Sequence, residues 1–399
     1  MSAPVVAVFA PDAVGHFAPL RSVIAELARH GCEVHVFTAG RFAPQVEAAG
    51  GRCVDLFARY PPEAADDESI PVPSRYVSFA GHYAEQIVND VAAVAPSLVV
   101  HDSFAVIGRA VGLALGVPYV SAVIGHNLPP ERYLPKLFAE REIRTSERCL
   151  RAVEVLRDSY GMADASPFSY VTGLSPYLNL LFEPPEWLSE ADRAPFEPVA
   201  FFGSVAPEVP RGPSGFRGDG GLKLHVSLGT VTWWYWPDLA IDALDAIARG
   251  VPDGADVEMS LSGGPAPAHR VEALRRAGMR VEPFADTWSA LTDADAIVTA
   301  HGANTTHEAV FSRVPMLGYP FHGDQPELAQ LCEDLGVAVR LVPEPRAPLT
   351  PEAVAAGLER IVAERAEFDA ALERARRWEL DVIARRGEVI ERMLALAQA

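Results

Sequence analysis

The chain has 399 residues, 49% of them hydrophobic, which is enough apolar material for two buried cores. Its formal net charge of −19 repels nucleic acid and anionic membrane surfaces, so neither is an expected partner. The four cysteines are scattered without a metal-binding or disulfide pattern, and no uninterrupted apolar stretch forms a signal peptide or an integral membrane segment, which together favour the cytoplasm.

Short apolar runs alternate with helical patterns through the first half of the chain. Strands are predicted at residues 5–10, 33–38, 53–57, 97–101 and 117–123, with helices at 19–30, 42–49 and 105–115. This alternation predicts a doubly wound parallel sheet with helices on both faces. Two longer segments, residues 60–89 and 126–167, carry either a binding surface or peripheral helices that pack on the sheet.

The second half repeats the pattern after a Gly- and Pro-rich linker at residues 203–221. Six strands and their helices are predicted within residues 222–364, and the tail at 365–399 reads as a charged helix that packs back on the first domain. The expected fold is α/β, with two Rossmann-like domains, residues 1–202 and 222–364, whose sheets face an interdomain cleft with their carboxyl ends.

The most informative segment is residues 300–309, Ala-His-Gly-Ala-Asn-Thr-Thr-His-Glu-Ala, between a predicted strand and a predicted helix. A small-residue turn at a helix start presents free backbone N–H groups and the positive end of the helix dipole, and hydroxyls add donors. Such a turn can bind a diphosphate without a metal. The alternative is ordinary N-capping by Asn304 or Thr305, which leaves His301 and Glu308 unexplained.

Two candidate catalytic residues follow predicted strands of the first domain. His16 lies in Gly-His-Phe-Ala-Pro after the strand at 5–10, and Asp102 directly follows the strand at 97–101. Since ligands bind at the carboxyl ends of parallel strands, we expect both residues at the mouth of the cleft. A neutral imidazole there can take a proton from a hydroxyl nucleophile, and a carboxylate can hold its tautomer. His101 should point to the opposite face and be structural.

One formal metal motif, Asp293-Ala294-Asp295, lies between a short helix and a strand and not on a loop that could bind a donor. No other group of His, Cys, Asp and Glu has ligand spacing, so no metal site is expected. A dehydrogenase is also disfavoured, because neither domain's first strand is followed by Gly-x-Gly-x-x-Gly.

Further motifs are Ser227-Leu228-Gly229-Thr230, Val314-Pro315 and Pro320 to Gln325. With Gly15-His16 and residues 300–309, they resemble family 1 glycosyltransferases, the group that includes plant secondary-product, macrolide and antibiotic glycosyltransferases. The resemblance spans most of the chain in domain order and is sharpest over residues 284–341. It implies the GT-B architecture and an inverting, metal-independent reaction.

The resemblance also implies a role for each matching residue. His16 is the general base and Asp102 orients it. The diphosphate is contacted by His301, the backbone at Gly302, Asn304, Thr305 and Thr306, with Ser227, Gly229 and Thr230 in the facing turn. Glu308 takes the ribose hydroxyls, Phe284 and Thr287 meet the base, and Asp324 and Gln325 take the sugar hydroxyls.

The chain departs from the family pattern at two places. Six residues separate His301 from Glu308 where the family has seven, which leaves the register of Asn304–Thr306 on the phosphates open. Thr287 stands where the family has glutamine, so uracil and thymine are not distinguished. Acceptor-binding candidates are aromatic or polar residues of the long segments and of the Trp-Trp-Tyr-Trp run, namely Phe79, Tyr83, His126 and Trp233.

The expected activity is transfer of a hexose from a UDP- or dTDP-sugar, UDP-glucose being favoured, to a hydroxyl of a small lipophilic natural product. The nucleotide sugar is a co-substrate, no cofactor is required, and the protein is expected to be a monomer or homodimer. Two alternatives remain: a non-catalytic auxiliary protein of the same architecture, and a sugar-nucleotide epimerase. Loss of turnover on His16→Ala with nucleotide binding retained would separate a transferase from an auxiliary protein.

Overall fold

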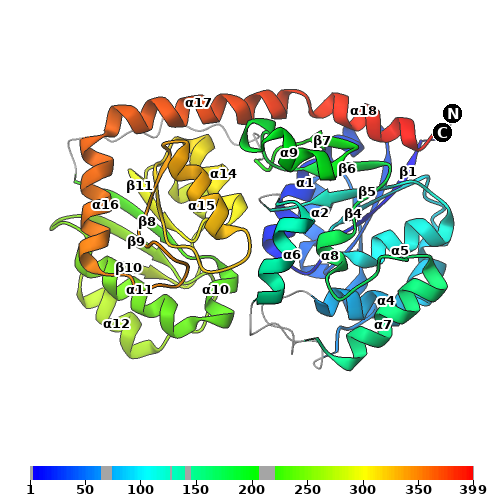
Figure 1. Cartoon of the computed structure of the whole chain (residues 1–399), viewed down its shortest axis with the longest axis horizontal. Coiled ribbons are helices and arrows are strands. Elements are labelled where there is room, and N and C mark those ends of the chain that lie inside the picture. The colour runs from blue at the N-terminus through cyan, green and yellow to red at the C-terminus, as the bar shows by residue number, and fades with distance from the viewer. Residues whose placement is uncertain (1–2, 64–73, 126–127, 140–144, 206–220, 399) are drawn as a thin grey trace. The chain divides into compact units, whose positions relative to one another are not determined.

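The computed structural model describes residues 3–63, 74–125, 128–139, 145–205 and 221–398, so His126 and most of the predicted linker lie outside the described residues. The chain forms two compact units, shown in Figure 1. Unit 1 contains Met1–Ala206 and Val382–Ala399, and unit 2 contains Pro207–Asp381. Helix α17 (Arg365–Ala384) therefore begins in unit 2 and ends in unit 1.

Unit 1 is built on a seven-stranded sheet in which every pair of neighbours is parallel. The strand order is β3-β2-β1-β4-β5-β6-β7. Sequence order therefore runs outward in both directions from the neighbours β1 and β4. The strands are β1 (Val5–Phe9), β2 (Glu33–Thr38), β3 (Arg52–Asp55), β4 (Leu98–Asp102), β5 (Tyr119–Val123), β6 (Leu178–Leu181) and β7 (Val199–Phe201).

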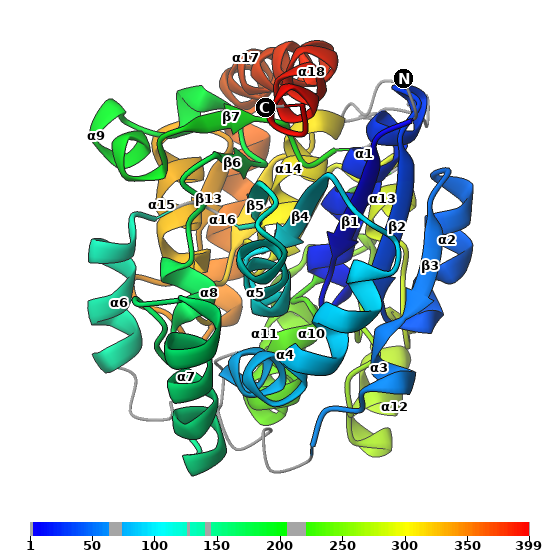
Figure 2. The ribbon, with the colours of Figure 1, turned by 90° about the vertical axis from the view of Figure 1, so that its right-hand side faces the viewer.

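Helices cover both faces of this sheet, as Figure 2 shows. Because side chains alternate along a strand, Val6 and Val8 of β1 face a core with α1 (Val14–Arg29), α2 (Ala43–Ala48) and α18 (Arg386–Leu396). Ala7 and Phe9 face a second core with α4 (Ser74–Ala92), α5 (Val106–Leu115) and α7 (Glu147–Tyr160). Shorter helices are α3 (Leu56–Arg59), α6 (Pro130–Ala139), α8 (Ser169–Thr172) and α9 (Glu190–Arg193).

Unit 2 repeats the arrangement with six parallel strands in the order β10-β9-β8-β11-β12-β13. Here the sequence order reverses between β8 and β11. The strands are β8 (Lys223–Ser227), β9 (Asp256–Ser260), β10 (Arg280–Glu282), β11 (Ala296–Thr299), β12 (Met316–Gly318) and β13 (Ala338–Arg340). The helices are α10 (Thr230–Tyr235), α11 (Pro237–Gly250), α12 (Ala268–Arg276), α13 (Thr287–Ala290), α14 (Ala303–Ser312), α15 (Gln325–Asp334) and α16 (Pro351–Ala363).

The fold confirms the predicted α/β class with two parallel sheets and differs from the prediction in local elements. Strands β6 and β7 were not predicted, and residues 56–59 form α3 where a strand was expected to continue. Helix α1 begins at Val14, so Pro19 lies inside it and does not open it. Among the described residues, no helix combines the length and apolar character needed to cross a membrane.

Two histidines are fully buried at the ends of central strands. His101 in β4 is 1% exposed, and its Nδ1–H donates to the Asp102 carbonyl oxygen at 2.9 Å. His301, which follows β11, is fully buried. Burial disfavours the charged ring, and it lowers the pKa of His101 from its ordinary 6.5 to about 4 and that of His301 to about 3. Both rings are therefore neutral near pH 7.

These lowered pKa values predict a pH-dependent stability. As the pH falls below about 6.5, the unfolded chain binds a proton at each ring that the folded chain does not, so stability present at pH 7 is lost as the medium becomes acidic. The expected loss between pH 7 and pH 5 is about 2 kcal/mol per histidine. Urea unfolding at the two pH values should show a smaller loss for His101→Gln and for His301→Gln. The same loss in wild type, in both variants and in the exposed-site control His30→Gln would contradict this assignment.

The contact between α4 and α7 depends on Gly81. A Cβ at this position would come within 2.5 Å of the Cα, Cβ and carbonyl region of Ala152 in α7. We therefore expect Gly81→Ala to destabilise unit 1 by about 1–3 kcal/mol, as overpacking does. Gly387 in α18 is the matched control, since its Cβ would meet no described heavy atom closer than 3.9 Å. Gly387→Ala should leave the unfolding midpoint unchanged or raised, and equal effects of the two substitutions would count against this packing.

Candidate functional site

The polar residues of unit 1 that the sequence singled out lie where its strand order reverses. β1 and β4 are neighbours, and the chain leaves them toward opposite edges of the sheet. His16 lies in the first turn of α1, which follows β1, and Asp102 is the last residue of β4. In doubly wound folds this point at the carboxyl edge is the preferred place for a ligand.

His16 and Asp102 form a direct pair. His16 Nδ1 lies 2.9 Å from Asp102 Oδ2 and 3.2 Å from Oδ1. The Asp102 side chain is fully buried, whereas that of His16 is 18% exposed. Because an ionised carboxylate only accepts hydrogen bonds, the Nδ1 atom carries the proton and Nε2 keeps its lone pair.

Phe104 holds both members of the pair, and sequence reasoning missed it. Its backbone N–H donates to Asp102 Oδ1 at 2.7 Å, and its ring lies 4.0 Å from the His16 ring, centroid to centroid. The buried carboxylate thus accepts from an amide and an imidazole, which offsets the cost of its burial. The sequence signal was its place two residues after Asp102, in the loop that leaves the strand.

Aromatic side chains continue from Phe104 into unit 1. Tyr170 of α8 lies 5.2 Å from the Phe104 ring, and Tyr76 of α4 lies 6.4 Å from it. Burial raises the pKa of both tyrosines, so their phenols stay neutral near pH 7. The Phe104 ring beside His16 is therefore packed against two further aromatic rings with neutral hydroxyls.

Two predicted acceptor residues, Phe79 and Tyr83, lie in α4 and make contacts within unit 1. Phe79 is 3% exposed and packs in the core against Phe57 and Tyr83, so contact with an acceptor is not supported for it. The Tyr83 hydroxyl donates to the Pro61 carbonyl oxygen at 3.0 Å. Helix α4 thus packs on the sheet as a peripheral helix, the alternative to a binding surface.

In unit 2 the equivalent reversal lies between β8 and β11. Ser227 ends β8 and is 6% exposed, while Gly229, with a φ of 74°, is exposed and precedes Thr230 at the start of α10. The positive φ explains the glycine, because other residues are strained in this conformation. These residues lie on the same carboxyl edge as the start of α14, which follows β11.

The start of α14 is suited to bind an anion. Its N-cap is Gly302, which has no side chain to cap the helix. A Cβ on Gly302 would meet no described heavy atom within 4 Å, so the helix start borders open space. Asn304, Thr305 and Glu308 are all partly exposed there. The first-turn N–H groups and the helix dipole favour a phosphate at this position.

Two residues predicted to touch the diphosphate are buried instead. The His301 ring would lie 2.7 Å from a Cβ on Gly318, and Thr306 is fully buried with its Oγ1 3.4 Å from His301 Nδ1. The side chains therefore contact each other beneath the turn, where only glycine at 318 leaves room. We correct their expected role to support of the turn, because neither side chain has exposed surface.

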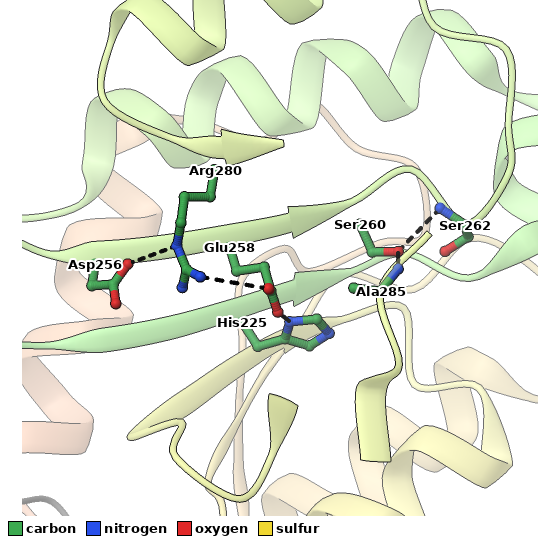
Figure 3. A network of polar contacts seen from close by, with 7 residues as sticks. All are labelled: His225, Asp256, Glu258, Ser260, Ser262, Arg280 and Ala285. Atoms are coloured by element: carbon green, nitrogen blue, oxygen red, sulfur yellow. Dashed lines mark hydrogen bonds and ion pairs between the residues drawn. The ribbon is translucent and has the colours of Figure 1, made fainter. Parts of the chain in front are cut away.

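The loop after β10 carries an exposed aromatic ring. Phe284 is 63% exposed, and Thr287 opens α13. Figure 3 shows how this loop is held: Ser260 Oγ at the end of β9 accepts the N–H groups of Ser262 at 3.2 Å and Ala285 at 3.1 Å. A flat ring on a fixed loop at the carboxyl edge can stack on a nucleobase.

A charged network lies on the same sheet, toward the amino ends of its strands (Figure 3). His225 of β8 is 2% exposed, and its Nδ1 contacts Glu258 Oε2 at 3.1 Å. Arg280 lies between Glu258 at 3.7 Å and Asp256 at 3.0 Å. Burial is the largest cause of the lowered pKa of His225, and the nearby Glu258 opposes it. The network joins β8, β9 and β10.

Asp324 and Gln325 follow β12, and only Asp324 is partly exposed. Gln325 Oε1 accepts the N–H groups of Phe321 at 2.9 Å and His322 at 3.2 Å, and the residue is 7% exposed. The expected contact of Gln325 with sugar hydroxyls is thus not supported by its oxygen, which shapes the loop. His322 is in turn stacked on Trp236, with centroids 5.4 Å apart, a contact that sequence reasoning missed.

Trp233, a predicted acceptor residue, is fully buried in the core of unit 2, beside Gly264. That prediction is corrected, because the ring has no exposed surface. In the formal metal motif, Asp295 Oδ2 accepts the backbone N–H of Lys223 at 2.8 Å. Across the described ranges, no cluster of three or more His, Cys, Asp or Glu side chains could hold a metal ion.

Comparisons with known proteins agree on a single class. Residues 292–370 match the family model "UDP-glucoronosyl and UDP-glucosyl transferase". The chain is 27% identical over 351 residues to oleandomycin glycosyltransferase of Streptomyces antibioticus, covering 85% of this chain and 79% of that protein.

Solved structures show the same fold. The glycosyltransferase of kitacinnamycin superposes with a TM-score of 0.73 at 20% identity, covering 98% of this chain and 100% of the other. The glycosyltransferase VinC, solved in complex with dTDP, superposes with a TM-score of 0.65 at 19% identity, covering 99% of each chain. The matched segment 292–370 includes α14. The chain is a glycosyltransferase with the GT-B fold, and it resembles natural-product glycosyltransferases of Streptomyces.

Proposed function

We propose that the protein transfers a hexose from a UDP- or dTDP-sugar to a hydroxyl of a small lipophilic natural product, with inversion and without a metal. His16 is the general base and Asp102 orients it. The observation that carries this proposal is the contact between the partly exposed His16 and the buried Asp102, 2.9 Å apart.

The pair meets the demands of acceptor activation. A hydroxyl is a weak nucleophile near neutral pH, and Nε2 of the neutral ring accepts its proton as the oxygen attacks the anomeric carbon. Asp102 holds the Nδ1–H tautomer and stabilises the imidazolium that forms. The partly exposed ring of Phe104 beside His16 favours a lipophilic acceptor.

The proposed reaction forms one bond to the anomeric carbon and breaks another. The acceptor oxygen forms a bond to the anomeric carbon, and its proton goes to His16 Nε2. The bond from that carbon to the diphosphate breaks, and the leaving oxygen keeps the electron pair. Attack opposite the leaving group inverts the configuration, and solvent then takes the proton from His16.

The leaving diphosphate gains charge, and the start of α14 supplies preorganised donors for it. The N-cap glycine, Gly302, adds no side chain to the helix start, and Thr305 adds a hydroxyl. Phe284 stacks on the base and Glu308 takes the ribose hydroxyls. Asp324 binds the sugar. In this proposal the chain's own groups hold the donor.

The comparisons support the substrate classes. The relative from Streptomyces antibioticus is named for oleandomycin, and the VinC structure contains dTDP. We infer a natural product as acceptor and a thymidine or uridine diphosphate as the carrier.

The defining experiment incubates the full chain with UDP-glucose or dTDP-glucose and a panel of phenols and macrolides, and identifies products by mass spectrometry and NMR. An α-linked donor should give a β-linked product, with activity retained in EDTA. A product of retained configuration, or activity that requires a divalent cation, would overturn the proposed chemistry.

Removing the base should stop transfer and spare nucleotide binding. For His16→Ala we expect kcat to fall by about 10²–10⁴-fold, with the Kd of UDP and dTDP measured by calorimetry unchanged. Asp102→Asn should lower kcat through the wrong tautomer. The control is His30→Ala at the other end of α1, which should stay active. Full turnover of His16→Ala would exclude His16 as the base.

The exposed ring of Phe284 should contribute to nucleotide affinity. Its removal leaves no core cavity, and loss of one stacked base–ring contact should raise the Kd of UDP or dTDP by roughly 5- to 100-fold. Kcat at saturating donor should change little, because the base does not react. Val362→Ala, at an exposed apolar residue of α16, is the matched control. An unchanged Kd in Phe284→Ala would place the base elsewhere.

A further inference from the structure

A buried pair of side chains joins α14, the candidate donor-binding helix, to α17. His307 in α14 is 1% exposed and Glu379 in α17 is fully buried. The Nδ1–H of His307 donates to Glu379 Oε1 over 2.5 Å. Both residues belong to unit 2, and neither takes part in the proposed reaction.

Two further contacts join the same helices. Arg376 Nε donates to the Phe311 carbonyl oxygen at 3.0 Å, and its guanidinium lies 5.2 Å from the centre of the Phe311 ring. Arg313 pairs with Glu373 at 3.3 Å. Residues 373, 376 and 379 are three apart and therefore line one face of α17. This face contacts α14 from His307, near its start, to Arg313, directly after its end.

The contact between His307 and Glu379 carries a large desolvation cost, so it is a poor source of stability. Taking a carboxylate out of water costs several kcal/mol, which a single hydrogen bond offsets only in part, and an apolar pair of similar volume is often as stable. The second oxygen, Glu379 Oε2, has no hydrogen-bond partner among the described residues. The hydrogen bond between the two residues instead fixes the tautomer and the ring orientation of His307.

His307 lies in the part of α14 to which donor binding is assigned. It is followed by Glu308, and it comes one turn after Ala303, the first residue of the helix. A change in its position rotates or shifts the helix, and with it the N–H groups of the first turn and the Glu308 carboxylate.

We propose that Glu379 is a positioning residue for donor binding, which acts through His307 to hold α14 in register with the nucleotide diphosphate. This inference rests on the proposed function, in which α14 binds the donor. The carboxylate of Glu379 touches neither substrate. Its removal should therefore weaken binding of the donor and leave the chemical step largely intact.

The test compares steady-state kinetics of the full-length enzyme with UDP-glucose or dTDP-glucose, whichever the wild type uses. Glu379→Gln keeps the side-chain shape and removes the charge. We expect KM for the donor and Kd for the free nucleotide to rise together by roughly 3- to 30-fold, with kcat within about twofold of wild type. Glu379→Met gives a second, apolar variant, whose melting temperature should fall because the buried Nδ1–H of His307 loses its acceptor, while the donor KM still rises.

Two comparisons distinguish positioning from mere packing. His307→Gln should raise KM as Glu379→Gln does, and the double variant should be no worse than the more affected single variant, because the two residues act as one unit. Glu373→Gln removes the more exposed pair on the same face of α17 and should leave the donor KM unchanged.

The result that overturns the inference is a folded Glu379→Gln or Glu379→Met with the donor KM of wild type, or with a reduced kcat and an unaltered KM. A wild-type enzyme that binds no nucleotide and transfers no sugar would refute the proposed function itself. Activity in wild type together with unaltered variants would refute only the role of Glu379.

Discussion

Parallel strand pairing is the constraint on which both units depend. All strands of a parallel sheet end at the same edge, and the chain must return across a face through a helix before the next strand begins. Where the order reverses, between β1 and β4 in unit 1 and between β8 and β11 in unit 2, two such helices leave in opposite directions. His16 and Asp102 occupy the first of these points, and Gly229 and Gly302 the second.

Burial decides how the polar residues at these points behave. Asp102 is fully buried and is held by an imidazole and an amide, so its charge orients His16 rather than meeting solvent. His301 is buried without such a carboxylate, and its ring is neutral because desolvation lowers its pKa to about 3. Two histidines that both follow parallel strands thus have different chemistry because of their neighbours.

The candidate ligand-binding turns are held in place by buried polar side chains that pack or hydrogen-bond beneath them. The His301 ring and the Thr306 hydroxyl lie under the start of α14, and Gln325 holds the loop after β12 by accepting two of its N–H groups. Ser260 does the same for the loop that carries Phe284. Many polar residues of the motif therefore shape the backbone, and a smaller set stays exposed or partly exposed, namely Thr305, Glu308, Asp324 and Phe284, which are the candidates for donor contact.

The sequence by itself determined the class of fold, the two sheets, most strands and the positions of His16, Asp102 and residues 300–309 at strand ends. It could do so because apolar runs, glycines and helix starts are local signals. Strands β6 and β7, of four and three residues, escaped it because they are short and follow short helical turns that give no long periodic signal. The tertiary structure alone decided which side chains of a motif face outward, since burial depends on contacts from distant residues. Trp233 packs beside Gly264, Phe79 packs on Phe57, and His307 meets Glu379, 72 residues further along the chain.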